Sequence, residues 1–301
     1  MRSQIQQAIE VQQIDWERVV RQVRQVVGRL LLYAVLVAGG ILMAMPFLWM
    51  LSASLKPTNL IGVVPIVWIP PKIVWTHYID PWAVLPFLTF YRNTIVITFA
   101  NVVCILLTTS MVAFAFARIP FWGRDVHFLI LLATMMLPGQ VTLIPTYLLW
   151  SKLRAVNTFW PLMVPEWLSA AFDVFLFRQF YMTISPELDD SARIDGCGWF
   201  GIYSRILLPL CKPALGVLAI MNFSYNWNNF FDPLIYLNDP QRFTIALGLL
   251  YFRVRGGAGA ETQDIGGLMA MTIVSMIPVL IVFFIAQRRF IQGIVITGIK
   301  G

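Results

Sequence analysis

Long apolar runs, separated by shorter polar segments, follow one another along most of the chain. A helix needs about 20 apolar residues to cross a bilayer, because each residue advances it by about 1.5 Å. No water in the bilayer core can satisfy a broken backbone, so each run is expected to form one helix. Six transmembrane helices are predicted on this basis: Leu30–Leu51, Thr94–Ala117, Val126–Leu149, Pro161–Phe180, Pro213–Leu237 and Ile265–Ala286.

The composition supports an all-α integral membrane protein. Hydrophobic residues make up 58% of the 301 residues and charged residues 12%, whereas soluble domains carry about 25% charged residues. This excludes a soluble globular enzyme and a disordered protein, and it requires much of the surface to face membrane lipid. The net charge of +7 comes from scattered residues rather than a continuous basic stripe, so no nucleic-acid partner is expected. Cys104, Cys197 and Cys211 fit no zinc or disulfide spacing, and no metal site is predicted.

The distribution of Lys and Arg predicts the orientation. An even number of spans puts both termini on one side, and the segments on that side hold more Lys and Arg than the opposite segments. Cytoplasmic segments carry this excess, so both termini are placed in the cytoplasm. In the cytoplasmic segment 1–29, apolar residues from Gln4 to Gly28 recur at roughly helical spacing. They predict either a helix lying along the inner leaflet or a solvated extension.

The remaining organisation follows from the spans. Residues 30–91 are expected to hold the first transmembrane helix and an extracytoplasmic loop. This loop, Ser52–Tyr91, is rich in Trp, which suits a membrane interface, and in Pro, which argues against another buried helix. His77 lies in the loop with no partner visible in the sequence and is interpreted as incidental. Residues 92–288 are expected to form a core with five helices, and 289–301 a cytoplasmic tail.

A polar stretch at 185–208 separates the fourth and fifth predicted spans. Ser185 is a favourable N-cap, and Pro186 suits the first position of a helix. The acidic residues that follow complement the positive end of the helix dipole, and the helix should stop near Asp195–Gly196, because Gly tolerates a left-handed turn. A second helix is expected from about Trp199 to Leu207. The prediction is a helix-turn-helix that projects from the membrane with apolar residues available for a partner.

The same stretch resembles a known family. Asp190-Ser-Ala-x-x-Asp-Gly, followed by Phe200, Ile206 and Leu208-Pro-Leu210, is similar to the "EAA" loop in permease subunits of bacterial ABC importers. Other stretches resemble the carbohydrate-uptake branch and the smaller permease of maltose transporters: Ala113-Phe-Ala-Phe-Ala-Arg118, Leu137-Pro-Gly-Gln-Val-Thr-Leu-Ile-Pro145, Trp227-Asn-Asn229 and Gly298-Ile-Lys-Gly301. The departures are Asp190 and Ser191 at the start of the motif, Cys197 in place of alanine, and Asp173 where a small residue is expected.

The resemblance implies a type I ABC importer permease fold in the bacterial cytoplasmic (inner) membrane. The implied partners are a second permease subunit in a heterodimer, two ABC ATPase subunits, an extracytoplasmic solute-binding protein and a carbohydrate substrate. It further implies that the 185–208 loop holds a coupling helix that docks on an ATPase. The implied contacts are Glu187, Asp190, Ser191, Ala192, Asp195, Gly196, Cys197 and Phe200, with Ile299, Lys300 and Gly301 reaching the ATPases from the tail.

Polar residues at membrane depth mark a candidate substrate pathway. They are costly in lipid and are tolerated when they face a cavity or a partner, and amides and aromatic rings suit sugar hydroxyls and sugar faces. Hydrogen bonding between helices explains asparagine in a span equally well, so both interpretations stay open. The candidates are Asn222, Tyr225, Asn226, Trp227, Asn229 and Asp173.

Two other function classes fit the sequence less well. A membrane-embedded enzyme needs a convergent catalytic group, but His77 and His127 are the two histidines and neither lies in a carboxylate cluster. A self-sufficient secondary transporter of a small polar solute would show internal repeats, and none is visible. The Gly-rich run at 255–260 lacks the Gly-Lys-Ser/Thr ending of a phosphate loop. We therefore expect ATP hydrolysis by partner subunits, no cofactor and no enzymatic activity in this chain.

Overall fold

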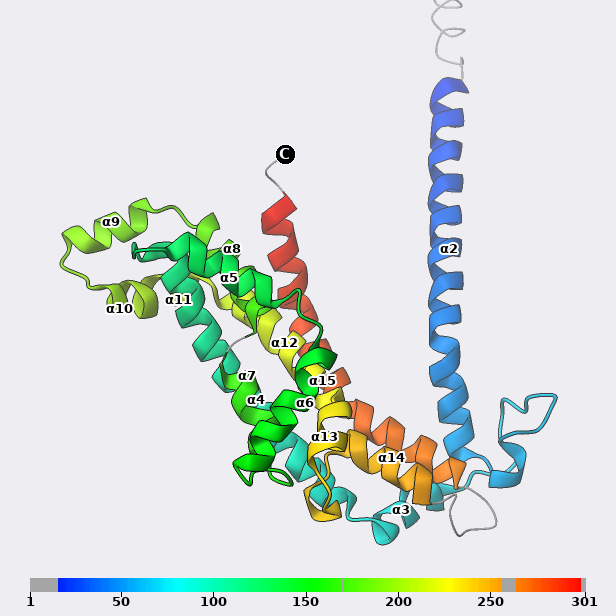
Figure 1. The fold of residues 1–301 in the computed structure, drawn as a ribbon. Coiled ribbons are helices and arrows are strands. Elements are labelled where there is room, and N and C mark those ends of the chain that lie inside the picture. The colour runs from blue at the N-terminus through cyan, green and yellow to red at the C-terminus, as the bar shows by residue number, and fades with distance from the viewer. Residues whose placement is uncertain (1–15, 169, 256–263, 299–301) are drawn as a thin grey trace, which may run out of the picture.

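The structure is a computed structural model that describes the backbone of residues 16–168, 170–255 and 264–298, and the side chains of 20–168, 170–254 and 264–287. The elements within these ranges are helices (Figure 1). In chain order they are α2 (Trp16–Leu55), η1 (Thr58–Leu60), η2 (Trp75–Tyr78), α3 (Asp80–Val84), α4 (Phe87–Arg118), α5 (Arg124–Thr134), α6 (Gly139–Lys152), α7 (Trp160–Trp167), α8 (Ala171–Thr183), α9 (Glu187–Ile194), α10 (Trp199–Gly201), η3 (Ile202–Leu207), α11 (Leu208–Leu210), α12 (Lys212–Asn228), α13 (Phe231–Tyr236), η4 (Pro240–Arg242), α14 (Ile245–Arg255) and α15 (Ile265–Gly298).

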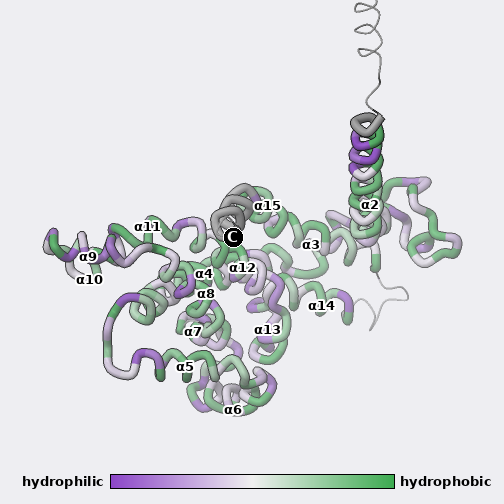
Figure 2. The backbone as a smooth tube through the Cα atoms, turned by 90° about the horizontal axis from the view of Figure 1, so that it is seen from above, coloured by the Kyte–Doolittle hydropathy of each residue, from purple (hydrophilic) through white to green (hydrophobic). Residues whose placement is uncertain are grey.

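Helix α2 stands apart from the other helices, which form a bundle (Figures 1 and 2). It confirms the first predicted span and extends it over 40 residues. Its apolar side chains from Leu30 to Leu48 are almost all exposed, and burial begins only near Ala53, at its lower end in Figure 1. Residues 16–28 continue the same helix, so the prediction of a separate surface helix is wrong there, and residues 1–15 lie outside the described part.

Three described helical segments are long and apolar enough to cross a membrane: Val20–Leu55, Phe87–Arg118 and Ile265–Gln287. Two bent pairs raise the number to five if each pair is counted as one span. The prediction of six uninterrupted helices is therefore wrong, although the first, second and sixth predicted spans each lie within one continuous helix.

Proline lies close to two of the interruptions. The third predicted span consists of α5 and α6, which meet at 93°, and α5 ends at Thr134, four residues before Pro138. The fifth predicted span is divided between α12 and α13 at Asn229, four residues before Pro233. Proline has no N–H to donate to the carbonyl four residues earlier, so a helix loses one hydrogen bond at each of these points. Helices α2 and α15 continue through Pro46 and Pro278, so proline favours the two interruptions without requiring them. The fourth predicted span is also divided, into α7 and α8.

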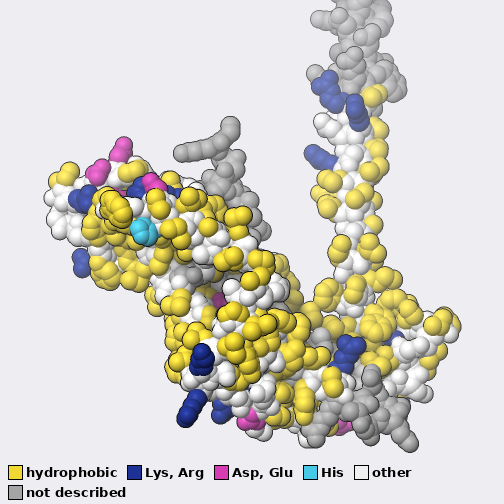
Figure 3. All heavy atoms as spheres, in the orientation of Figure 1, with side chains coloured by type: hydrophobic (Ala, Val, Ile, Leu, Met, Phe, Trp, Pro, Cys, Tyr) yellow, Lys and Arg dark blue, Asp and Glu magenta, His cyan; other side chains and the backbone are white. Residues whose placement is uncertain are grey.

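Two clusters of buried apolar side chains hold the bundle together. The upper cluster joins α4, α8, α9, η3 and α12, with Phe114, Phe177, Ile202 and Leu218 among its members. The lower cluster joins the other end of α4 to α7, α12, α13, α14 and α15. On the face drawn in Figure 3, apolar side chains cover most of the bundle, whereas basic and acidic side chains gather toward its two ends. This surface suits a body surrounded by lipid.

Candidate functional site

Residues 185–210, here called the elbow, project from the upper end of the bundle (Figure 1). Helix α9 begins at Glu187 with Pro186 as its N-cap, so the prediction of Ser185 at that position is wrong by one residue. The backbone N–H of Glu187 still donates to the hydroxyl of Ser185 at 3.3 Å. The helix ends at Ile194, and Gly196 follows at φ +79°, in the left-handed region that glycine tolerates. The second helix is present as α10, the π-helical η3 and α11. The predicted helix-turn-helix is therefore confirmed.

The two sides of α9 differ in exposure. Asp189 and Ala192 lie three residues apart and are buried against the bundle. The side chain of Ile194 is 86% exposed, and that of Phe200 on α10 is 72% exposed. Neighbouring exposed apolar side chains with acidic residues beside them are typical of a protein interface.

The predicted ATPase contacts divide between these sides. Ala192 is buried inside the chain, so it cannot reach a partner in this conformation, and Cys197 is half-buried. The exposed members of the predicted set are Glu187, Asp190, Ser191, Asp195, Gly196 and Phe200.

Arg118, at the end of α4, meets the elbow from below. Its Nη2 donates hydrogen bonds to the carbonyl oxygens of Tyr181 at 3.0 Å and Ile184 at 2.7 Å. Its Nε lies 3.0 Å from Oδ2 of Asp189. Burial raises the pKa of the Asp189 carboxyl, Arg118 acts in the opposite direction, and the neighbouring Asp190 raises it further.

Aromatic contacts join the elbow to α4 as well. The hydroxyl groups of Tyr203 and Ser110 lie 2.8 Å apart. The ring of Phe114 lies 5.4 Å from that of Tyr203 and 6.3 Å from that of Trp199, measured between centroids. The guanidinium of Arg193 stacks over the Trp199 ring at 3.9 Å, which ties α9 to α10.

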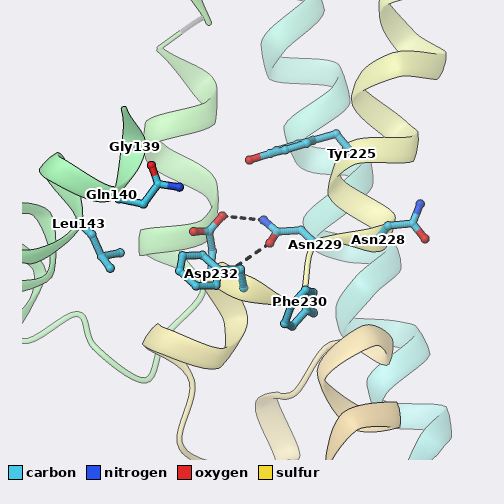
Figure 4. A pocket seen from close by; sticks show the side chains of 9 residues that line it. Gly139, Gln140, Leu143, Tyr225, Asn228, Asn229, Phe230 and Asp232 are labelled. Atoms are coloured by element: carbon cyan, nitrogen blue, oxygen red, sulfur yellow. Dashed lines mark hydrogen bonds between the residues drawn. The ribbon is translucent and has the colours of Figure 1, made fainter. Parts of the chain in front are cut away.

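A cavity of about 490 Å³ opens between α6, the end of α12 and the start of α13 (Figure 4). Asn229 Nδ2 donates to Oδ2 of Asp232 at 2.7 Å, and the Asp232 N–H donates back to Oδ1 of Asn229 at 3.3 Å. Amide, carboxylate and phenol groups thus border the cavity and can hydrogen-bond to a polar solute. The lining residues are Gly139, Gln140, Leu143, Tyr225, Asn228, Asn229, Phe230, Phe231 and Asp232.

Two of the predicted pathway residues, Tyr225 and Asn229, line this cavity. The other four are buried, and hydrogen bonding between helices describes them better. Asn222 Nδ2 donates to Oδ2 of Asp173 on α8 at 2.9 Å. The Asp173 carboxylate therefore has a hydrogen-bond partner within this chain. Trp227 Nε1 donates to the backbone of α15 at 3.0 Å.

Asn226 extends this buried polar contact toward α4. Its Oδ1 accepts from Asn101 Nδ2 at 2.6 Å, and its own Nδ2 donates to the carbonyl of Asn222 at 2.9 Å. Trp167 Nε1 donates to Oδ1 of Asn101 at 3.2 Å. The set Asp173, Asn222, Asn226, Asn101 and Trp167, here called the polar seam, therefore connects α8, α12, α4 and α7.

Sequence reasoning missed several of these residues. Gln140 lines the cavity although it was not among the predicted sites, and Asp232, a polar residue at the outer end of the fifth predicted span, lines it as well. The available signal was the interruption of a helix: Gln140 lies two residues after Pro138, and Asp232 lies directly before Pro233. Asn101, an amide inside an apolar run, gave the same signal as Asn226, but the sequence offered no means of pairing the two.

Other sequence interpretations can also be placed. His77 is buried, with Nδ1 3.0 Å from the carbonyl oxygen of Ser54 and Nε2 4.0 Å from Asp264, so it has a packing role. Among the described residues, no group of three or more His, Cys, Asp or Glu could hold a metal. The tail residues Ile299, Lys300 and Gly301, and the Gly-rich residues 256–260, lie outside the described part.

Comparisons with known proteins agree with this architecture. A family model described as a binding-protein-dependent transport system inner membrane component matches residues 105–296. The arabinooligosaccharides transport system permease protein of Halalkalibacterium halodurans is 38% identical over 213 residues, which cover 71% of this chain and 74% of that protein. The sn-glycerol-3-phosphate transport system permease protein of Yersinia enterocolitica is 30% identical over 270 residues, covering 87% and 94%.

The fold is similar to that of a chain in the crystal structure of a bacterial ABC transporter involved in the import of alginate, an acidic polysaccharide. The TM-score is 0.78 at 23% identity, and the match covers 87% of this chain and 96% of the other. Together with the sequence matches, this fold argues against the membrane-embedded enzyme and the secondary transporter. The chain therefore belongs to the binding-protein-dependent transport system inner membrane components, which are multi-pass permeases of ABC importers and not enzymes.

Proposed function

We propose that this chain is one of two different permease subunits of an ATP-driven importer, and that the exposed side of α9 docks on an ATPase subunit. The observation that carries the proposal is the elbow. One side of α9 is fixed to the bundle through Asp189 and Ala192, while its other side presents Ile194 and acidic residues with no cover from the described chain. When such a helix is displaced, its buried contacts can transmit the displacement to the transmembrane helices.

The orientation follows from the same element. The start of α2, α9 and the end of α15 lie at the upper end in Figure 1. ATP is cytoplasmic, so docking of an ATPase on α9 would place that end in the cytoplasm, in agreement with the Lys and Arg distribution.

The proposed partners account for the remaining exposed surfaces. A second permease subunit and lipid would cover the apolar side chains of α2. An extracytoplasmic solute-binding protein would deliver the solute to the opposite end. Two ATPase subunits, one for each permease, would supply the energy.

The proposed solute is a carbohydrate. One relative is named for arabinooligosaccharides, and the cavity presents the amide of Asn229, the phenol of Tyr225 and the carboxylate of Asp232. Amide and carboxylate groups hydrogen-bond to hydroxyls, and an aromatic ring packs against the apolar face of a sugar.

Gly196→Asp tests the docking proposal. Residue 196 is exposed and has φ +79°, so a side chain there is both strained and placed on the docking side of the turn. We expect the variant to reach the membrane while the ATPase subunits no longer co-purify with it. Gly62→Asp is the matched control, because Gly62 is exposed in the loop after α2 and a Cβ there meets nothing within 4 Å.

Co-purification at the wild-type level together with intact uptake in Gly196→Asp would refute docking at the elbow. Uptake that persists after removal of the ATPase subunits would refute the ATP-driven importer itself.

A further inference from the structure

One guanidinium joins three helices at the base of the elbow. Arg118 belongs to the end of α4, its two carbonyl acceptors belong to the end of α8, and its carboxylate partner Asp189 belongs to the first turn of α9. The three distances are 3.0, 2.7 and 3.0 Å. Arg178 on α8 also contacts two other helices, through the carbonyl of Phe116 on α4 and the ring of Phe128 on α5, but neither contact reaches the elbow.

The acceptors lie at the end of α8, where the last carbonyl groups of a helix lack partners within the helix. The Tyr181 carbonyl also accepts from the backbone N–H of Ile184 at 3.3 Å, and Arg118 adds a second donor there and a donor to the Ile184 carbonyl. A cation at this position also complements the negative end of the helix dipole. The planar guanidinium of Arg118 hydrogen-bonds to the two carbonyl groups through Nη2 while its Nε lies beside the carboxylate as an ion pair, whereas lysine offers a single charged point.

The ion pair is buried. The Arg118 and Asp189 side chains are 7% and 10% exposed. Removing one partner of a buried pair leaves the other charge without compensation. By contrast, Arg124 and Asp125 form an exposed pair at 3.3 Å, with exposed fractions of 34% and 80%, and such pairs contribute little.

Helix α9 depends on outside support. It has eight residues, and an isolated helix of this length is unstable in water. Within α9 itself, Asp189 and Ala192 are the buried residues. Ala192 contributes one methyl group to the upper cluster, so the buried ion pair of Asp189 with Arg118 is the other attachment of α9 itself to the bundle.

We infer that Arg118 and Asp189 are positioning residues that lock α9 to α4 and α8, so that a displacement of α9 moves the transmembrane helices with it. The inference rests on the proposed docking of α9 on an ATPase. Neither residue needs to touch the ATPase, because both side chains face the bundle. Loss of the contact should leave the ATPase bound while each hydrolysis event moves less solute.

The test uses the complete importer reconstituted in proteoliposomes, with its ATPases, companion permease and binding protein. Asp189→Ala removes the carboxylate, and Asp189→Glu retains it as the conservative variant. Asp125→Ala is the control, because it removes the carboxylate of the exposed pair near the same end of α4. Three quantities are measured: the amount of bound ATPase, the solute transported per ATP hydrolysed, and hydrogen exchange of the α9 amides.

Asp189→Ala is expected to bind ATPase at the wild-type level, to exchange α9 amides faster, and to lower transport per ATP about five-fold or more. Asp189→Glu should recover at least about half of the wild-type ratio, and Asp125→Ala should be unchanged. Wild-type transport per ATP in Asp189→Ala would overturn the inference. So would loss of bound ATPase with unchanged α9 exchange, because Asp189 would then be a direct contact.

If Asp189→Ala fails to reach the membrane, the inference is tested with Arg118→Lys instead. This variant keeps the charge and loses the fork, so it should assemble and still lower transport per ATP; a wild-type ratio would overturn the inference. Gly196→Asp is measured in the same importer. Full ATPase binding and uptake in that variant would refute docking of α9 on the ATPase. Failure of the proposed docking can therefore be distinguished from failure of the Arg118–Asp189 inference.

Discussion

The elbow and the cavity differ in how their residues are held in the bundle. At the elbow, a buried ion pair, aromatic contacts and the upper cluster fix short helices to α4 and leave one side uncovered. At the cavity, α6 begins and α12 ends where prolines interrupt the helices, and the lining side chains pair with close neighbours, as Asn229 does with Asp232. The difference teaches that the elbow is attached to the bundle by buried contacts with α4 and α8, as the proposed coupling role requires, whereas the cavity lies between the ends of helices.

The largest expected effect separates packing from docking at the elbow. Phe177 is fully buried in the upper cluster, whereas Phe200 is 72% exposed. We expect Phe177→Ala to lower the free energy of unfolding by about 3 to 5 kcal/mol, because it leaves a cavity in a packed core. Phe200→Ala should leave the unfolding temperature unchanged and weaken ATPase co-purification. Thermal unfolding in detergent measures the first effect, and equal unfolding temperatures for the two variants would contradict it.

A smaller effect separates the polar seam from the cavity. Asn226→Leu removes the oxygen that accepts a hydrogen bond from Asn101 inside the bundle. We expect the free energy of unfolding to fall by about 1 kcal/mol. Asn228→Leu is the matched control, because Asn228 is exposed and borders the cavity. Unfolding temperatures of the two variants in the same detergent provide the measurement. Reduced uptake by Asn226→Leu at unchanged stability would return Asn226 to the substrate pathway.

The smallest expected effect concerns the cavity lining. Tyr225→Phe keeps the ring and removes the hydroxyl, so uptake should show a few-fold higher KM with little change in stability, equivalent to about 1 kcal/mol or less. Tyr225→Ala should show a larger change, because it also removes the ring. Uptake kinetics in proteoliposomes measure both variants. If both matched the wild type, Tyr225 would have no part in solute contact.

The sequence predicted the elbow well because its signals are local. Ser185, Pro186 and Gly196 act on the residues beside them, so the start and end of α9 follow without knowledge of the fold. The pairing of Arg118 with Asp189 could not be found in this way. The two residues are distant in the chain, and Asp189 carried an equally good local explanation as a residue near the helix dipole.

The interrupted spans and the asparagines show the opposite situation. Pro138 and Pro233 were visible, but uninterrupted apolar runs outweighed them in the prediction of single helices. Asn222 and Asn229 are the same amino acid at one end of the same run, yet one bonds to α8 and the other borders the cavity. Hydropathy and side-chain chemistry are identical in both cases, so only the tertiary arrangement separates them.

The detached course of α2 has a consequence for assembly. The helix is anchored to its own chain only near its lower end, where it meets α15 and η2. The tilt of a membrane helix is set by the neighbours it packs against. In the proposed importer, the angle of α2 in the bilayer would therefore be set by the subunit that packs beside it, and the final geometry of this chain would depend on assembly.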